Sequence, residues 1–436
     1  MNQKSGGEHN HSIEMAATHA KRRIQLGFGR LGPGLITGAA DDDPSGIATY
    51  SQAGAQFGLN MLWTLVFTYP LMVAIQVTSA RIGRVTGKGL AANLFGVFPR
   101  SVVVALVAAL FFANTINIGA DIAAMGAAAE LLTGWGARLF TVAAALISLI
   151  LQVLVPYRLY VKVLKWLTLV LFAYVAVAFA VHIDWVEVAT RIVRPQIAFS
   201  SDLLTMIVAV FGTTISPYLF FWQTSEEVEQ MDLKDQPNLK EMDPSAARLQ
   251  LRRMGIDTFT GMAISNLIAF FIMLTTAVTL HQHGMTDIQT SADAAKALQP
   301  VAGNLAFLLF SLGIIGTGFL AVPVLAGSTA YAACETAGWP KGLEKKPGEA
   351  KQFYGVIGLG MLIALAVLFS PLDPIKMLFW SAVINGIIAV PIMAAMMVVA
   401  RQHRRMGVFV ATTWQRILGW VATLAMAAAV LGMFLV

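Results

Sequence analysis

The sequence predicts an all-α membrane protein that crosses the bilayer eleven times. Hydrophobic residues make up 57% of its 436 residues and charged residues only 12%, and the mean hydropathy is +0.69. Soluble domains carry about 45–50% apolar and about 25% charged residues, so this chain has too few polar side chains to cover a water-exposed surface. Its apolar residues also come in stretches of about 20 residues, the length that a helix needs to cross the hydrocarbon core.

Eleven such stretches follow one another along the chain. They are apolar all round, whereas the strands of a membrane barrel alternate with period two, so helices are expected. The stretches cover residues 31–57, 60–80, 101–132, 137–156, 162–182, 202–225, 254–280, 301–333, 353–370, 374–400 and 413–435.

We expect one transmembrane domain, residues 31–436, and no second, water-soluble domain. Residues 1–30 form a predicted cytoplasmic arm, which lacks the apolar core and cleavage site of a signal peptide. The single cysteine, Cys334, excludes a disulfide framework and a cysteine-ligated metal cluster.

The distribution of Lys and Arg predicts the orientation of the spans. With the N-terminus placed in the cytoplasm, 25 of the 30 basic residues fall on the inner side and five on the outer side. Cytoplasmic loops of membrane proteins are enriched in Lys and Arg. We therefore predict a multi-pass protein of the cell (inner) membrane with its N-terminus inside and its C-terminus outside. The positive charge follows the membrane topology, so nucleic acid is not expected as a partner.

Two of the stretches contain residues that a spanning helix normally avoids. The middle of 31–57 holds Asp41, Asp42, Asp43, Pro44, Ser45 and Gly46, and the middle of 202–225 holds Thr213, Thr214, Ser216, Pro217 and Tyr218. A carboxylate at the bilayer centre costs about 2.5–3.5 kcal/mol even on lenient scales, and proline removes a backbone donor. We therefore expect helix breaks at 43–46 and at Pro217, although a lone proline such as Pro217 can also mark a simple kink.

The two breaks lie in the first and the sixth predicted spans, five apart. This spacing predicts two inverted five-helix repeats, about 31–182 and 202–400, followed by an extra helix at about 413–435. Broken helices at matching places in such repeats indicate a binding site near the bilayer midplane. The free carbonyls at the ends of the half-helices and the Asp43 carboxylate favour a cation there. The predicted contact shell consists of Asp43, Ser45, Gly46, Ser216 and Tyr218 with backbone carbonyls near Ala40 and Thr213.

The same residues resemble the NRAMP (natural resistance-associated macrophage protein) family of divalent metal transporters, which have the LeuT-like fold. Asp43-Pro44 matches the Asp-Pro of the family's first helix, and the tract that follows, Gln52-Ala53-Gly54-Ala55-Gln56-Phe57-Gly58, looks nearly identical to the family's. The stretch Ser79–Lys88 after the second span is also similar. The resemblance extends from about residue 31 to at least residue 335 and implies transport of a divalent metal.

The departures from the family fall in the site. Ser45-Gly46 replaces the family's Gly-Asn, so the asparagine ligand is missing, and Ser216-Pro217-Tyr218 replaces Met-Pro-His. The family's third helix carries an Asp and a Glu that help to conduct protons, whereas this chain has Asp121 alone, displaced by about a residue. The chain thus resembles a divergent branch, related to magnesium and aluminium transporters. A soft thioether ligand is absent, which favours hard ions such as Mg²⁺, or Mn²⁺.

Several other residues are candidates for a vestibule or for coupling. Asp41, Asp42 and Asp121 lie within predicted spans, although Asp121 could also pair with a neighbouring backbone group or hydroxyl. Glu226, Glu227 and Glu229 form either a cation exit vestibule or a solvated helix end. Asn385 either reaches the cavity or makes a helix–helix hydrogen bond. We expect Asp257 to be solvated, and His281 with His283 form a weak metal-binding candidate on an outer loop.

The sequence therefore predicts a secondary transporter or facilitator of a divalent cation with weak or no proton coupling. The alternative is a LeuT-like carrier or sensor that has lost metal transport and handles an organic solute. No Walker sequence, dinucleotide loop or nucleophile elbow is present, so no enzyme activity and no cofactor are expected. The expected partners are the lipid bilayer and a small cationic substrate, without an obligate protein partner.

Overall fold

The computed structural model describes residues 32–157, 159, 166–369 and 373–436, and the predicted N-terminal arm lies outside them. Within these ranges the secondary structure is entirely helical. The long unbroken helices are α4 (Leu62–Thr86), α6 (Arg100–Thr133), α7 (Ala137–Leu154), α13 (Pro244–Thr279), α16 (Ala306–Ala337), α18 (Pro374–Arg401) and α20 (Thr413–Leu435).

The remaining helices are half-helices or short segments. The two interrupted stretches become α2 (Pro33–Asp41) with α3 (Pro44–Phe57), and α11 (Ser201–Thr214) with α12 (Pro217–Leu233). Two shorter apolar helices are α9 (Phe172–Ala180) and α17 (Lys351–Ala364). The short elements between them are α5 (Leu90–Leu94), α10 (Trp185–Val193), α14 (Ser291–Ala295), α15 (Gln299–Ala302) and α19 (His403–Met406).

Eight helical segments in the described part of the chain are long and apolar enough to cross a membrane. The number is nine if the bent pair Leu169–Ala180 and Trp185–Val193 forms one span. This count treats Pro44–Thr86 as one segment, and α17 is shorter than a span. The predicted stretch 162–182 begins with residues that the structure does not describe. The protein is thus a multi-pass membrane protein, and the number of eleven spans remains a prediction.

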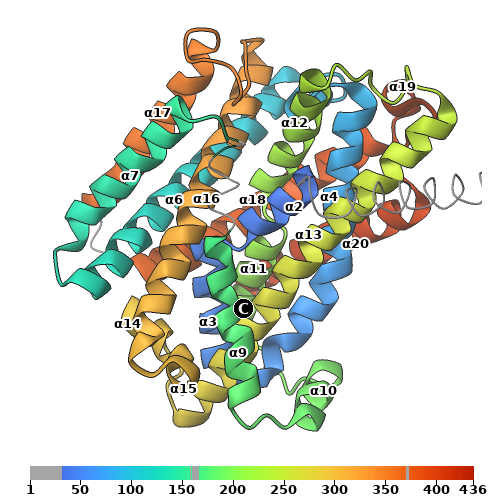
Figure 1. Cartoon of the computed structure of the whole chain (residues 1–436). Helices are drawn as coiled ribbons and strands as arrows, with labels where there is room; N and C mark the ends of the chain where they lie inside the picture. Colours follow the sequence, from blue (N-terminus) through green and yellow to red (C-terminus); the bar gives the residue numbers. More distant parts are fainter. Residues whose placement is uncertain (1–31, 158, 160–165, 370–372) are drawn as a thin grey trace, which may run out of the picture.

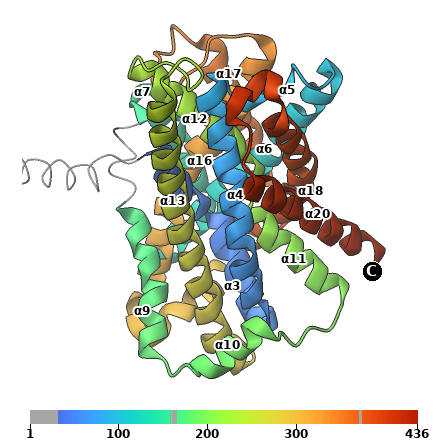
Figure 2. The same ribbon diagram turned by 90° about the vertical axis from the view of Figure 1, so that its right-hand side faces the viewer.

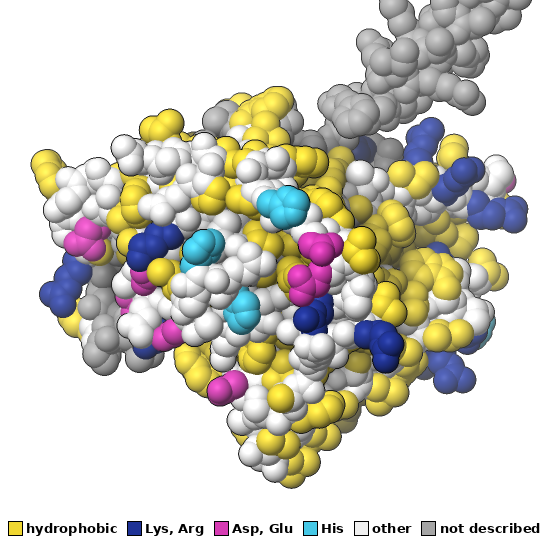
Figure 3. Space-filling model, turned by 90° about the horizontal axis from the view of Figure 1, so that it is seen from below, with side chains coloured by type: hydrophobic (Ala, Val, Ile, Leu, Met, Phe, Trp, Pro, Cys, Tyr) yellow, Lys and Arg dark blue, Asp and Glu magenta, His cyan; other side chains and the backbone are white. Residues whose placement is uncertain are grey.

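The helices pack into one bundle whose two ends differ (Figures 1 and 2). At the upper end in Figure 1 lie the loop between α16 and α17, the end of α12, and α19. These are segments that the Lys/Arg pattern predicts to be cytoplasmic. At the lower end lie α10, α14 and α15, and Figure 3 shows that this face carries histidine and acidic side chains with a few basic ones.

Local sequence signals explain several helix ends. Asp243 and Asp373 cap α13 and α18 by accepting hydrogen bonds from the backbone amides of Ser245 and Ile375, both at 2.9 Å. In each case proline follows as the first helical residue, where its missing N–H costs nothing. α4 ends at Gly87, whose φ of 64° is a left-handed conformation that glycine adopts without strain.

Helix α2 lies tightly against α13, which positions the first helix break. A Cβ atom added at Gly38 of α2 would overlap the backbone of Gly261 of α13. Because both residues are glycine, the backbones of the two helices can approach closely at this crossing. The break after α2 is therefore held at a fixed place against the longest helix of the bundle.

Candidate functional site

The two helix breaks lie against each other. α2 ends at Asp41 and α3 begins at Pro44, so the first interruption comprises Asp42 and Asp43 and starts slightly before the expected 43–46. The Tyr50 hydroxyl of α3 and the Thr214 hydroxyl of α11 are 3.1 Å apart. A Cβ atom added at Gly46 would be 3.3 Å from Oγ1 of Thr213, which places these two residues in contact.

Proline and aspartate define the geometry of the breaks. Pro44 and Pro217 are the first residues of α3 and α12, where a fixed φ suits a helix start and no backbone donor is lost. Asp43 is the cap of α3, and its Oδ1 accepts a hydrogen bond of 2.7 Å from the amide of Gly46. The helix therefore begins again directly after the residue that carries the carboxylate, Asp43.

Asp43 is buried and surrounded by donors. Its side chain is 1% exposed. The Ser45 hydroxyl lies 2.9 Å from Oδ1 and 3.0 Å from Oδ2, and the Asn117 amide donates to Oδ2 at 3.1 Å. The side chain of Ser45 is therefore hydrogen-bonded to Asp43. Both oxygens of the carboxylate therefore accept hydrogen bonds.

Asn117 was missed in the sequence analysis, and it connects three predicted residues. Its Nδ2 also donates to Oδ2 of Asp121 at 3.1 Å, and its Oδ1 accepts from Nδ2 of Asn385 at 3.0 Å. Asp121 therefore pairs with a side-chain amide, and Asn385 reaches the site through a helix–helix hydrogen bond. Asn117 and Asp121 are four residues apart on α6 and so lie on one helix face. The four-residue spacing from Asp121 is the sequence signal that could have identified Asn117.

The side chains from the second break are turned toward backbone carbonyls. The Ser216 hydroxyl lies 2.9 Å from the carbonyl oxygens of Gly212 and Thr213. The Tyr218 hydroxyl donates to the carbonyl of Ala40 at 3.1 Å. The two carbonyls that the sequence predicts as ligands, those of Ala40 and Thr213, therefore already accept hydrogen bonds from side chains.

Asp41 and Asp42 contact α13. The Ser265 hydroxyl is 2.6 Å from Oδ2 of Asp41 and 3.0 Å from Oδ1 of Asp42. A hydroxyl has one proton, so it donates to one carboxylate at a time. Both carboxylates are buried, and the structure assigns them to the contact between the first break and α13.

In the acidic cluster at the end of α12, Glu226 and Glu227 are buried and Glu229 is partly buried, so the interpretation as a solvated helix end is wrong. Glu227 is 1% exposed and forms an ion pair of 2.6 Å with Arg84 of α4. Glu226 is also buried. Glu229 accepts from the Tyr331 hydroxyl and from the amides of Leu343 and Glu344. The ion pair with Arg84 and the hydrogen bonds from backbone amides explain how Glu227 and Glu229 are accommodated away from water.

The structure corrects the expectation for Asp257 and gives the partners of His281 and His283. Asp257 is not simply solvated: its Oδ2 accepts from the amide of Gly34 at 2.8 Å and so caps the start of α2. His281 and His283 are engaged through Nδ1 with the carbonyls of Ala55 and Thr279, both at 2.8 Å. Both rings therefore have backbone partners, that of His281 on α3 and that of His283 at the end of α13.

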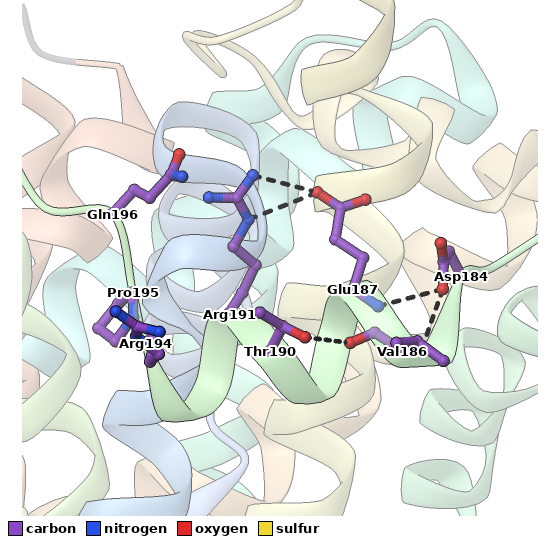
Figure 4. A pocket seen from close by; sticks show the side chains of 8 residues that line it. All are labelled: Asp184, Val186, Glu187, Thr190, Arg191, Arg194, Pro195 and Gln196. Carbon is purple, nitrogen blue, oxygen red and sulfur yellow. Dashed lines mark hydrogen bonds and ion pairs between the residues drawn. The ribbon is translucent and has the colours of Figure 1, made fainter.

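A surface cavity of about 700 Å³ lies at α10, at the lower end of the bundle in Figure 1 and away from the helix breaks. Figure 4 shows its lining. Asp184 caps α10 through the amide of Val186 at 2.9 Å, and Glu187 pairs with Arg191 at 3.3 Å. Two arginines, Arg191 and Arg194, also line this cavity, so it is a poorer cation site than the helix breaks.

No group of three or more His, Cys, Asp or Glu residues that could hold a metal occurs within the described ranges. A cation at the breaks would therefore be held by one or two carboxylates together with amide, hydroxyl or carbonyl oxygens. The predicted site residues at the breaks are nearly inaccessible to solvent. The structure thus describes a closed arrangement of this site.

Comparisons with known proteins agree with this architecture. Among curated proteins, two divalent metal cation transporters named MntH, from two strains of Klebsiella pneumoniae, are each 25% identical and align over 94% of both chains. A manganese transporter of Eremococcus coleocola has the same fold, with a TM-score of 0.71 and 16% identity over 92% of this chain and 85% of its own. Mhp1, a nucleobase-cation-symport-1 family transporter, gives a TM-score of 0.58 and 13% identity over 93% of both chains.

The family assignment comes from the sequence. The family model described as natural resistance-associated macrophage protein-like matches residues 34–436, which is nearly the whole chain. This match confirms the resemblance seen in the Asp43-Pro44 motif and in the tract that follows it. The chain belongs to the natural resistance-associated macrophage protein (NRAMP) family.

Proposed function

We propose that this protein is a secondary transporter or facilitator of a divalent metal cation, with Mg²⁺ or Mn²⁺ favoured, across the cytoplasmic membrane. One observation carries the proposal: a buried carboxylate, Asp43, lies where two broken helices meet. The related proteins from Klebsiella pneumoniae are named for divalent metal transport, and they align along nearly the full length of this chain.

The chemistry of the breaks supports a hard ion. Residues 40–46 and 213–218 contain neither sulfur nor imidazole, so every ligand that they can offer is an oxygen. Mg²⁺ prefers oxygen ligands, keeps several of its waters and is usually bound through one or two carboxylates. Softer thiolate or thioether ligands would be needed to favour soft ions.

We further propose that proton coupling is weak or absent. Tyr218 stands where the family has a histidine, the side chain that changes its charge most readily near neutral pH. Transport down the ion's own gradient is then sufficient. A potential of 100 mV contributes about 2.3 kcal/mol per charge, or about 4.6 kcal/mol for a divalent ion. The expected orientation has the upper end of Figure 1 in the cytoplasm.

Flux in proteoliposomes tests the proposal. Vesicles containing the purified protein and a fluorescent indicator for Mg²⁺ or Mn²⁺ are given the ion outside and an inside-negative potential. We expect uptake that exceeds the uptake of protein-free vesicles and is lost in the Asp43→Ala variant. Wild-type protein without uptake of either ion, in vesicles where its orientation and folding are verified, would overturn metal transport. That result would favour the organic-solute carrier or sensor.

A further inference from the structure

The amide of Asn117 lies between two buried carboxylates. Its Nδ2 is 3.1 Å from Oδ2 of Asp43 and 3.1 Å from Oδ2 of Asp121. Asp121 and Asn117 are both 0% exposed. Two buried carboxylates that converge on one point repel each other, and a positive charge at that point would stabilise both. The amide N–H groups occupy this point in the structure.

Three oxygen atoms around Asn117 have no hydrogen-bond partner among the described residues. They are Oδ1 of Asp121, Oδ1 of Asn385 and Oγ1 of Thr213, and all three belong to buried side chains. Asn385 donates a hydrogen bond to Asn117, and Asn117 donates one to Asp121. Thr213 lies against Gly46, beside Asp43. A buried polar atom without a partner costs about 1–3 kcal/mol, so unpaired oxygens gathered around one site favour a ligand that oxygen can bind.

The two amides can reverse their roles together. A half-turn of the Asn117 amide exchanges its oxygen and nitrogen, which occupy nearly the same space. The oxygen then faces Asp43 and Asp121, and the nitrogen faces Asn385. If Asn385 makes the same turn, its presently unpaired Oδ1 accepts the hydrogen bond from Asn117. The bond between the amides is kept, and a third oxygen is directed at the two carboxylates.

We propose that Asn117, supported by Asn385, is a ligand of the transported divalent cation. The inference rests on the proposed function and specifies the ligand set: Asp43, Asp121 and Asn117, with water completing the shell. Without the ion the amide donates to both carboxylates, and with the ion its oxygen binds the metal. An amide from α6 thereby takes the place of the asparagine that resemblance to the family leads one to expect at Gly46.

This arrangement also explains the hard-ion preference. Carboxylate and amide oxygens are hard ligands, and two carboxylates neutralise a divalent charge. The hydroxyls of Ser216 and Tyr218 contribute little in this arrangement, because they are bonded to carbonyls of the helix ends. Selectivity would then depend on α3, α6 and α18 more than on the second break.

Calorimetric titration of purified protein with MgCl₂ and MnCl₂ tests the role of Asn117. The variants are Asn117→Ala and Asn117→Asp, with Asn114→Ala as the matched control. Asn114 lies one turn earlier on α6, is equally buried and donates to Leu325, Ser328 and Thr329 of α16. We expect affinity to fall about 10–100-fold in Asn117→Ala, the usual effect of losing a group that supports a metal site. The control should bind as the wild type does.

Asn117→Asp separates a ligand from a hydrogen-bond donor. Aspartate has nearly the same shape and keeps the ligand oxygen but cannot donate when ionised. A metal ligand therefore predicts retained binding and a larger ion-induced rise in melting temperature, because the ion-free form carries three carboxylates. Loss of binding in Asn117→Asp as well as in Asn117→Ala would overturn the ligand role and leave Asn117 as a donor to Asp43.

The outcomes distinguish this inference from the proposed function. A wild-type protein that binds neither ion contradicts the function itself. Binding that is lost in Asp43→Ala but unchanged in Asn117→Ala contradicts only the role of Asn117. Equal losses in Asn114→Ala and Asn117→Ala indicate a general effect on α6 and also overturn it. If Asn117→Ala does not yield a folded protein by size-exclusion chromatography, the nearly isosteric Asn117→Asp decides the question.

Discussion

The hydroxyl of Tyr218 donates a hydrogen bond of 3.1 Å to the carbonyl of Ala40, and so the start of α12 is bonded to the end of α2. Ala40 is one of the carbonyls that a cation at the first break would be expected to bind. The tyrosine therefore competes with the ion for this oxygen, and it also ties the two breaks together in the closed arrangement.

Replacing Tyr218 with Phe should raise the affinity for Mg²⁺ and lower the stability of the ion-free protein. The carbonyl of Ala40 becomes free to bind the ion, while the loss of one net hydrogen bond costs about 0.5–1.5 kcal/mol. Calorimetry and thermal unfolding measure the two effects. Weaker binding in Tyr218→Phe would show instead that the hydroxyl is itself a ligand, as the sequence suggested.

Replacing Asp43 with Asn should abolish cation binding without unfolding the protein. Asparagine caps a helix about as well as aspartate, so the bond to the amide of Gly46 can be kept while the charge is removed. Asp42→Asn is the control, because Asp42 lies beside Ser265 and outside the Asn117 network. Titration calorimetry of both variants, with their melting temperatures, gives the answer. Full-strength binding by Asp43→Asn would contradict the assignment of the site.

Selectivity should follow the oxygen ligands. We expect Mg²⁺ to bind, Mn²⁺ to bind without strong discrimination against Mg²⁺, and Cd²⁺ to gain no advantage, because no soft ligand is present at the breaks. Competition calorimetry, with Cd²⁺ added to Mg²⁺-saturated protein, measures the order. Tight Cd²⁺ binding by a protein that gives no response to Mg²⁺ would be incompatible with this prediction.

Transport should not acidify the vesicle interior in proportion to ion entry. Asp121 has Asn117 as its hydrogen-bond partner, and an amide does not carry a proton onward at neutral pH. A pH-sensitive dye sealed in proteoliposomes, read together with the metal indicator, measures coupling. Acidification that follows uptake strictly, and that disappears in Asp121→Asn while metal uptake continues, would show that this single acid still carries protons.

The ion pair of Arg84 and Glu227 should stabilise the end of the bundle that the Lys/Arg pattern predicts to be cytoplasmic. The two side chains are 11% and 1% exposed and 2.6 Å apart. Removing one partner of such a buried pair costs about 3–5 kcal/mol, because the other charge is left unpaired. Unfolding of Glu227→Gln, Arg84→Met and the double variant Arg84→Met/Glu227→Gln tests the pair. The double variant should be more stable than either single variant.

The same ion pair is connected to the first broken helix. Glu227 accepts from Gln223, whose Oε1 accepts from the Thr37 hydroxyl of α2. Loosening the pair should therefore release α2 and change the rate of metal flux in proteoliposomes.

In the unfolding experiment, a double variant that is destabilised by as much as the sum of the two single variants would show that the two charges act independently.

The sequence by itself determined the membrane class, the family and the approximate positions of both helix breaks. These features depend on local chemistry. Apolar stretches define helices, Pro44 and Pro217 define the points where helices restart, and Asp43 marks the charge between them. The Asp43-Pro44 motif and its following tract were sufficient to indicate the NRAMP family, which the match over residues 34–436 confirms.

Only the tertiary structure decided which atoms meet at the site. Asn117 lies 74 residues from Asp43 and 268 residues from Asn385 along the chain, so no local pattern brings the three together. The direction of a hydroxyl depends equally on its neighbours: Ser216 and Tyr218 turn to carbonyls, and the acids of α12 find Arg84, Tyr331 and the loop after α16. A buried polar group needs a partner within the protein, and for Asp43, Tyr218 and Glu227 the packing of helices far apart in sequence determines which partner is within reach.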